Sequence, residues 1–144
     1  MSFQGMDISA SGLTAQRLRM DVISGNLANV NTTRTPEGGP YRRRMVVFEE
    51  MLQQAVDTLP FQPTRTPLSG VRVSAVVESE EPPMMVYDPQ HPDANEEGYV
   101  AMPNVNSVHE MADMISASRA YEANLTAMNL SKTMTQKALS ILRV

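Results

Sequence analysis

The sequence predicts an α+β fold in which long N- and C-terminal helices pair as an antiparallel, coiled-coil-like core, with a small antiparallel β-rich domain inserted between them. All ten prolines lie between Pro36 and Pro103, and proline breaks helix interiors. Both proline-free ends carry apolar residues at helical spacing. The middle holds short β-branched and aromatic runs bounded by turn residues. We therefore expect a helical core domain formed by residues 1–34 and 105–144, with residues 35–104 as the insert.

The first helix is predicted over residues 5–30, ending near Asn29–Thr32. One apolar stripe consists of Met6, Leu13, Met20, Ile23, Leu27 and Val30. A second stripe, roughly 135° around the helix, consists of Ile8, Ala15, Leu18 and Val22. Gly12 and Gly25 each cost about 1 kcal/mol relative to Ala in a helix interior. We therefore expect another backbone to approach closely at these glycines.

The second helix is predicted over residues 108–142, preceded by Ser107-Val-His-Glu110, which fits a capping box. At 1.5 Å per residue it forms a rod of roughly 50 Å, longer than a small globule needs. A heptad frame places on one seam Met111, Met114, Ser118, Tyr121, Leu125, Met128, Lys132, Thr135, Leu139 and Leu142. A second stripe consists of Ala123, Ala127, Leu130, Met134, Ala138 and Ile141.

Two apolar stripes on each helix indicate an assembling subunit. Pairing of the two helices covers one face of each, and the remaining faces need neighbours. We expect side-chain hydrogen bonds from Asn26 and Asn29 to the C-terminal helix or to an adjoining subunit, because Asn is a mediocre helix former. The candidate assembly interface comprises Ile8, Leu13, Leu18, Met20, Val22, Asn26, Leu27, Asn29, Tyr121, Asn124, Leu125, Met128, Met134 and Ile141.

The middle of the chain is predicted to contain four short antiparallel strands. They are Tyr41–Phe48, Val71–Val77, Met84–Tyr87 and Gly98–Met102. Glu49–Leu59 is compatible with one further helix. Four short strands bury little area by themselves, so this part should lean on the helix pair or on a neighbour.

The residues offer no support for an enzyme or a metal protein, and we expect no cofactor. Asp93–Gly98 resembles half of an EF-hand loop, but the twelfth position is Asn104 and prolines exclude the flanking helices. His91 and His109 are far apart in sequence and show no zinc pattern. In the run Arg42–Arg44, strand alternation sends the middle arginine to the opposite face, and the acidic middle segment favours salt bridges or solvation over nucleic acid.

Charge and hydropathy exclude further classes. The net charge is −4, and residues 36–103 hold eleven acidic and five basic residues. No apolar run approaches the roughly 18 residues of a membrane span, so we expect no membrane insertion. The N-terminus lacks the basic start and apolar stretch of a secretory signal. The chain contains no cysteine, which rules out disulfides and leaves the redox compartment open.

Several segments resemble bacterial flagellar axial proteins of the rod, hook and hook-associated family. Ser24–Thr32 (SGNLANVNT) is similar to the N-terminal signature of that family, and Ser118–Asn124 (SRAYEAN) to its C-terminal signature. Tyr41–Phe48 and Gly98–Asn106 resemble the proximal-rod members in particular. The resemblance spans nearly the whole chain.

This resemblance implies a structural subunit that stacks into a tubular drive shaft, with a discontinuous helical core and a β-rich insert. It implies export through the flagellar type III apparatus without a cleaved signal, and a place in the rod of the basal body. The implied partners are rod subunits of the FlgB, FlgF and FlgG type, the rod-base adapter FliE, and copies of the chain itself. The alternative is a cytosolic coiled-coil adaptor or secretion chaperone, which would share the heptads but would not need both signatures.

Overall fold

The computed structural model describes residues 2–51 and 70–141, with side chains from Gly5 onward. The elements, in chain order, are α1 (Ser2–Ala28), β1 (Arg44–Met51), β2 (Gly70–Glu78), β3 (Met84–Tyr87), β4 (Tyr99–Met102) and α2 (Ser107–Ile141). The α+β prediction is confirmed, and each of the four predicted strands is present in shifted or identical bounds.

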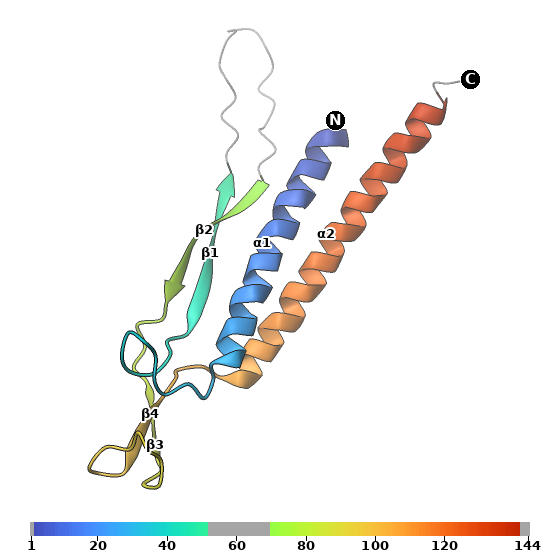
Figure 1. Ribbon diagram of the computed structural model, residues 1–144. Helices are drawn as coiled ribbons and strands as arrows, with labels where there is room; N and C mark the ends of the chain where they lie inside the picture. Colours follow the sequence, from blue (N-terminus) through green and yellow to red (C-terminus); the bar gives the residue numbers. More distant parts are fainter. Residues whose placement is uncertain (1, 52–69, 142–144) are drawn as a thin grey trace, which may run out of the picture.

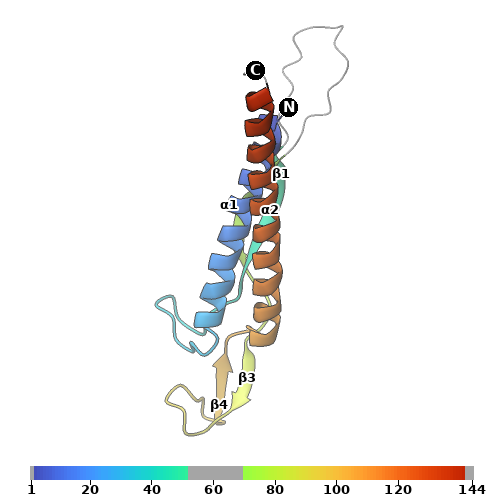
Figure 2. The same cartoon turned by 90° about the vertical axis from the view of Figure 1, so that its right-hand side faces the viewer.

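The molecule is elongated, and α1 lies at its centre. The two helices lie side by side and run in opposite directions, so that the N-terminus and the C-terminal end of α2 lie at the same end (Figures 1 and 2). The hairpin of β1 and β2 packs along α1 on the side away from α2 (Figure 1). The hairpin of β3 and β4 projects beyond the helices at the opposite end (Figure 2).

The helix ends depend on asparagine side chains. At the end of α1, the Asn29 amide donates to the Gly25 carbonyl at 2.9 Å, and its oxygen accepts from the Thr32 hydroxyl at 3.1 Å. At the start of α2, Asn106 Oδ1 accepts the backbone N–H groups of Val108 and His109 at 3.0 and 3.2 Å. Asn106 is therefore the N-cap, and the predicted capping box starting at Ser107 is wrong.

The β1–β2 ladder is antiparallel, and its register shifts between Val47 and Phe48. A bulge at this point leaves Ser74 without a paired residue and increases the local twist. The predicted helix over Glu49–Leu59 is wrong for its first three residues, which belong to β1. The rest of that segment lies outside the described residues.

Short polar contacts hold β2 against α1. The Ser11 hydroxyl donates to the carbonyl of Ile8 at 2.7 Å and accepts the backbone N–H of Val71 at 3.1 Å. A side chain at Gly70 would come within 2.7 Å of this same hydroxyl. The close approach of helix and strand therefore requires glycine at this position.

The β3–β4 hairpin is held by an aromatic pair and a tight turn. Tyr87 and Tyr99 face each other across the strands, with ring centroids 5.3 Å apart in an edge-to-face arrangement. Gly98 has a φ of 81°, and a Cβ there would lie 3.0 Å from the Tyr87 ring. The turn therefore needs glycine both for its backbone conformation and for the space it leaves to the ring.

The seam between the helices differs from the predicted heptad frame at every second position. Among the described elements α2 packs on α1 alone, so its covered residues mark the seam. At seam spacing they are Glu110, Met114, Ala117, Tyr121, Asn124, Met128, Ser131 and Thr135, and Ser107, Asp113, Ser118 and Ala120 beside them are half-buried. Met111, Ser118, Leu125 and Lys132 were expected where Glu110, Ala117, Asn124 and Ser131 stand. Small and polar side chains occupy half of the seam, and apolar periodicity cannot detect them.

The glycines of α1 do not meet another backbone. A Cβ added at Gly12 would come within 3.0 Å of the Asn124 amide group, which is a side chain of α2. Nothing lies within 4 Å of a Cβ at Gly25. Gly12 therefore provides the space for Asn124, and the expectation of close backbone approach at both glycines is wrong.

Candidate assembly interface

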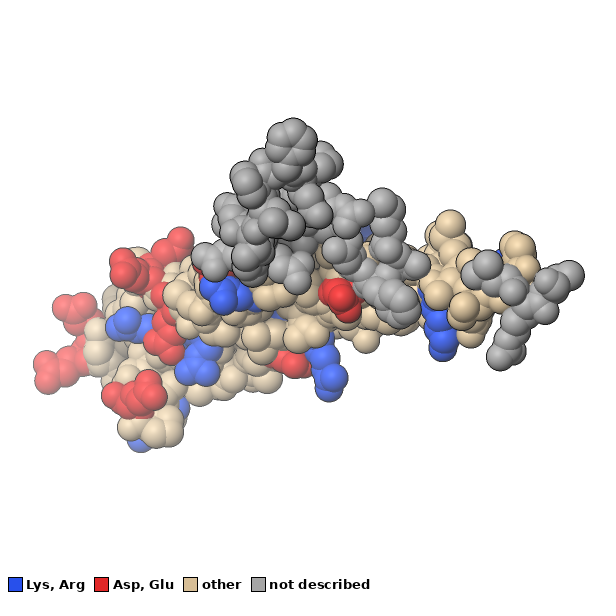
Figure 3. Space-filling view, turned by 90° about the horizontal axis from the view of Figure 1, so that it is seen from above, with Lys and Arg blue, Asp and Glu red and all other residues tan. Residues whose placement is uncertain are grey.

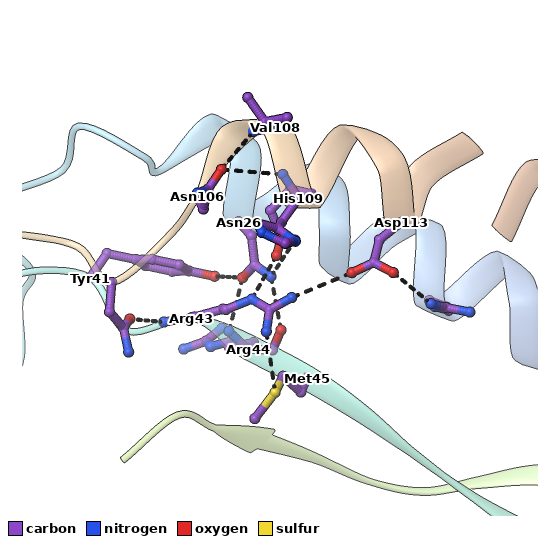
Figure 4. A network of polar contacts seen from close by, with 12 residues as sticks. Asn26, Tyr41, Arg43, Arg44, Met45, Asn106, Val108, His109 and Asp113 are labelled. Carbon is purple, nitrogen blue, oxygen red and sulfur yellow. Dashed lines mark hydrogen bonds and ion pairs between the residues drawn. The ribbon is translucent and has the colours of Figure 1, made fainter. Parts of the chain in front are cut away.

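A polar junction formed by Asn26, Tyr41, Arg43, Glu110 and Asp113 joins the end of α1, the approach to β1 and the first turns of α2 (Figure 4). At its centre Asn26 is 1% exposed. Its amide nitrogen donates to the Arg44 carbonyl at 2.8 Å and to Glu110 Oε2 at 2.9 Å. Its oxygen accepts from the Tyr41 hydroxyl at 3.0 Å and from the Arg44 N–H at 2.9 Å. Both donors and both acceptor positions of the amide are used.

Glu110 is the charged partner in this junction, and it is completely buried. Its second oxygen, Oε1, accepts from Arg43 Nε at 2.6 Å. The same guanidinium lies 3.5 Å from Asp113, which also pairs with Arg19 of α1 at 3.0 Å. Each buried charge thus has an opposite charge and further hydrogen bonds, which is the condition under which burial is tolerated.

The geometry of the junction fixes how the helices align. The Asn26–Glu110 bond links the last turn of α1 to the first turn of α2, and a shift of either helix by one residue would leave both side chains buried without partners. Unsatisfied buried polar groups cost about 1–3 kcal/mol each. Burial also raises the pKa of the Tyr41 phenol above its ordinary value of 10.0, so this hydroxyl remains a donor to Asn26 at neutral pH.

The predicted asparagine contacts are realised in different ways. Asn26 bonds to the C-terminal helix, as expected. Asn29 bonds within the end of its own helix and its following turn. Asn124 donates to the Ala120 carbonyl one turn earlier at 2.9 Å and lies against Gly12. Asn26 thus links elements of the subunit, Asn29 ends a helix, and Asn124 fills the seam between the helices.

The structure divides the fourteen sequence-predicted interface residues by exposure. Only Asn26 is fully buried. Those half-buried are Ile8, Leu13, Met20, Val22, Leu27, Asn29, Tyr121, Asn124 and Met128. Those exposed are Leu18, Leu125, Met134 and Ile141. Leu125 is 40% exposed, which contradicts its predicted place in the seam. The predicted second stripe of α2 lies on the exposed side of the helix throughout.

Sequence reasoning missed four members of the junction and its surroundings: Arg19, Tyr41, Arg43 and Asp113. Glu110 was noticed but assigned to a helix cap. The available signal was a polar residue at the apolar spacing, because Glu110 stands one heptad before Ala117 and two before Asn124. A polar residue repeated in register with a seam indicates a buried polar contact.

A second polar link joins the loop after α1 to the β3–β4 loop. Asp93 accepts from the Thr33 hydroxyl at 2.8 Å and pairs with the guanidinium of Arg34. The Thr33 hydrogen bond, together with the Arg34 charge, holds the pKa of Asp93 below its ordinary value of 3.8. The carboxylate that began the calcium-like motif is thus engaged by protein groups.

The described residues carry no arrangement suited to metal chemistry or to membrane insertion. Within residues 2–51 and 70–141, no three His, Asp or Glu side chains gather closely enough to hold a metal ion. Neither described helix is long and apolar enough to cross a membrane. The exposed apolar row of α2 and the polar junction are therefore the features that call for a functional explanation.

Known proteins similar to this chain identify its family. A family model described as flagella basal body rod protein matches residues 6–34, and one described as flagellar basal body rod FlgEFG protein C-terminal matches residues 96–141. The flagellar basal-body rod protein FlgC of Borreliella burgdorferi is 49% identical, covering 98% of this chain and 97% of its own. The chain belongs to the FlgC family of flagellar basal-body rod proteins.

Further members of the FlgC family show the same extent of similarity. The FlgC protein of Bacillus subtilis is 47% identical over 97% of each chain. That of Salmonella typhimurium is 44% identical over 94% of this chain and 93% of its own. The two family models match α1 with its following turn, and β4 with α2. The Asn26–Glu110 bond therefore joins the two segments that characterise flagellar rod proteins.

Proposed function

We propose that the chain is a structural subunit of the proximal rod, and that it assembles with other rod proteins into the tubular shaft that transmits torque and encloses the export channel. The observation that carries this proposal is the exposed apolar row on α2, which no residue in the described part of the chain covers. It includes Leu130, Met134 and Ile141, all more than half exposed. Contiguous apolar surface of this kind marks protein interfaces.

The helical core that makes these contacts is discontinuous in sequence. We infer that residues 1–34 and 105–144 form one coiled-coil-like domain, and that residues 35–104 form a β-rich insert. The antiparallel course of α1 and α2 and the register set by the polar junction support this division. The fourteen candidate interface residues remain a proposal, with the exposed Leu18, Met134 and Ile141 its best-supported members.

The proposed partners follow from a place in the proximal rod. They are rod subunits of the FlgB, FlgF and FlgG type, the rod-base adapter FliE, and copies of the chain itself. Export through the flagellar type III apparatus without a cleaved signal belongs to the same proposal. A structural role requires many distributed contacts rather than one reactive site, and the described surface offers long apolar and charged faces of that kind.

Fractionation of a motile host tests this function. A strain lacking the chain should be non-motile, and an epitope-tagged copy should restore motility and sediment with detergent-resistant basal bodies. The variant Leu130→Asp should be expressed and exported but absent from the basal-body fraction. Val108→Asp, an equally exposed change on the same helix, serves as the control. A tagged wild-type protein that stays in the soluble fraction would favour the adaptor or chaperone alternative.

A further inference from the structure

The C-terminal end of α2 extends past the end of α1. Asn26 lies beside Glu110, and Gly12 lies beside Asn124. In an antiparallel pair this alignment places Ser2 level with Met134. Residues 135–141 therefore extend roughly 10 Å beyond α1, as Figure 1 shows at the end where both termini lie. We call residues 130–141 the tail.

The tail is apolar where it is uncovered. Leu139 is 58% exposed and Ile141 is 75% exposed. Leu130 and Met134 lie on the same helix within three turns and are exposed to a similar degree. Among the described elements α2 packs on α1 alone, and a two-turn helical extension beyond its partner helix has little stability of its own, so this end of the molecule gains most from a partner.

The opposite end of the molecule is also uncovered. The β3–β4 hairpin, which we call the tip, projects past the start of α2 (Figure 2). Met84, Met85 and Tyr87 are each more than half exposed, although they come from both faces of β3. An isolated two-stranded hairpin is marginally stable in water. The tip therefore presents a second apolar surface, far from the tail.

The two ends carry opposite charge. The tip, residues 84–102, contains four acidic residues and no Lys or Arg, and of these Asp93 pairs with Arg34. Residues 123–141 contain Lys132 and Lys137 and no acidic residue. Figure 3 shows Asp and Glu side chains gathered toward the fainter, more distant end of the molecule, with some Lys and Arg side chains among them. The N-terminal end of α1 lies at the same end of the molecule as the tail. Its first acidic residue in sequence is Asp7.

We propose that the tip of one copy docks on the tail of a second copy, in a head-to-tail contact between their apolar residues that is steered by the acidic tip and the basic tail. Apolar surface supplies affinity, and complementary charge supplies orientation. Two different surfaces on one subunit form a heterologous contact, and such contacts build open helical assemblies when the rotation does not close. The proposal rests on the rod function and names the surfaces and partner for one axial contact.

The test uses two variants that disable opposite ends of the full chain. Met85→Lys places a positive charge in the tip, where it would face the tail lysines. Ile141→Asp places a negative charge in the tail, where it would face the acidic tip. Both side chains are exposed, so circular dichroism of each variant should match that of the wild type. Val108→Asp is the matched control, because it lies on α2 outside both surfaces.

Analytical ultracentrifugation of the purified chains gives the readout. The wild type and the control should form chains of increasing length with concentration, and added salt should shorten them because surface charges are screened. Each end variant alone should associate at least about tenfold more weakly, equivalent to 1.4 kcal/mol. A mixture of the two variants should associate more strongly than either variant alone, because the intact tip of one variant can dock on the intact tail of the other.

Several results would overturn the head-to-tail contact. A wild type that stays monomeric at all concentrations would do so, as would self-association of either variant alone at wild-type strength. If either variant misfolds, the exposed charge changes Glu96→Lys with Glu97→Lys and Lys132→Glu with Lys137→Glu repeat the experiment. Failure of this contact with intact sedimentation of the wild type in basal bodies would leave the rod function standing.

Discussion

The two halves of the helix pair differ in polarity and burial. Near the β3–β4 end the contact between α1 and α2 is polar, buried and fully hydrogen-bonded, and it centres on Asn26 and Glu110. Toward the termini α2 is apolar and exposed, with Leu130 and Ile141 facing outward. The first half stabilises one alignment of the helices within the subunit. The second half contributes little to the subunit and is available to neighbours.

The exposed apolar stripe of α2 differs from the apolar stripe of most helices. In most helices the strongest apolar row faces the protein's own core. Here the buried positions of the described helices are Ser9, Gly12, Ala15, Ile23, Asn26, Glu110 and Ala117. Ile23 is the one large apolar residue among them, while Leu130 and Ile141 remain in solvent. The exposed apolar pattern of α2 therefore fits the proposed assembly contacts, and the polar and small residues stabilise the helix pair within the subunit.

The sharpest way to break this comparison is to place the same charge in each half. Ala117→Asp puts an unpaired carboxylate at a fully buried position and should destabilise the free chain by about 4 kcal/mol or more. Leu130→Asp, on the same helix, should change the stability by less than about 0.5 kcal/mol. Urea unfolding followed by circular dichroism measures both. Equal destabilisation would refute the division into two halves.

Removing the charge at the junction should have the next largest effect. Glu110→Ala leaves Arg43 and Asn26 without their partner and should cost about 3 kcal/mol. The estimate lies at the low end for a buried pair because Arg43 is partly exposed and can still reach Asp113. Glu122→Ala, an exposed change on the same helix, is the control. Comparable unfolding midpoints for the two variants would show that the junction does not stabilise the helix pair.

Asn26→Ala should have a smaller effect than loss of the charge, at about 2 kcal/mol. Of its partners, Tyr41 is half-buried and Glu110 keeps its bond to Arg43 after the change. Asn29→Ala removes only local bonds at the end of α1 and should cost less than about 1 kcal/mol. Hydrogen exchange of the first turns of α2 provides the measurement. Faster exchange in the Asn29 variant than in the Asn26 variant would contradict the assigned roles.

The smallest effect concerns the acidic tip. Because Thr33 and Arg34 lower the pKa of Asp93, this carboxylate stabilises the fold above its unfolded pKa of 3.8, and the contribution is lost as pH falls through the still lower folded value. Asp93→Asn should flatten the pH dependence of the melting temperature in that acid range. Asp88→Asn, in the same loop, serves for comparison. Parallel curves for wild type and the Asp93 variant would refute the link.

The sequence predicts the secondary structure well and the packing only in part. Proline placement and β-branched runs locate both helices and all four strands. The heptad frame fails at alternate positions. It places Leu125 in the seam instead of Asn124, because leucine is the more apolar residue. The apolar pattern also gives no reason to prefer Ala117 over Ser118. Sequence patterns do not predict the polar junction, because its members come from three segments far apart in the chain. Its satisfaction depends on their geometry in space, which composition and periodicity do not encode.

The placement of the termini has a mechanical consequence. The free ends of α1 and α2 lie at the same end of the pair (Figure 1), so tension applied between them pulls the helices apart from that end. Contacts then break one turn after another, as in a zipper, rather than all at once as in shear. The weakly held tail yields first, and the junction at Asn26 and Glu110 yields last. A chain handled by its ends would thus come apart at low force, while one held laterally by neighbours in an assembly would resist.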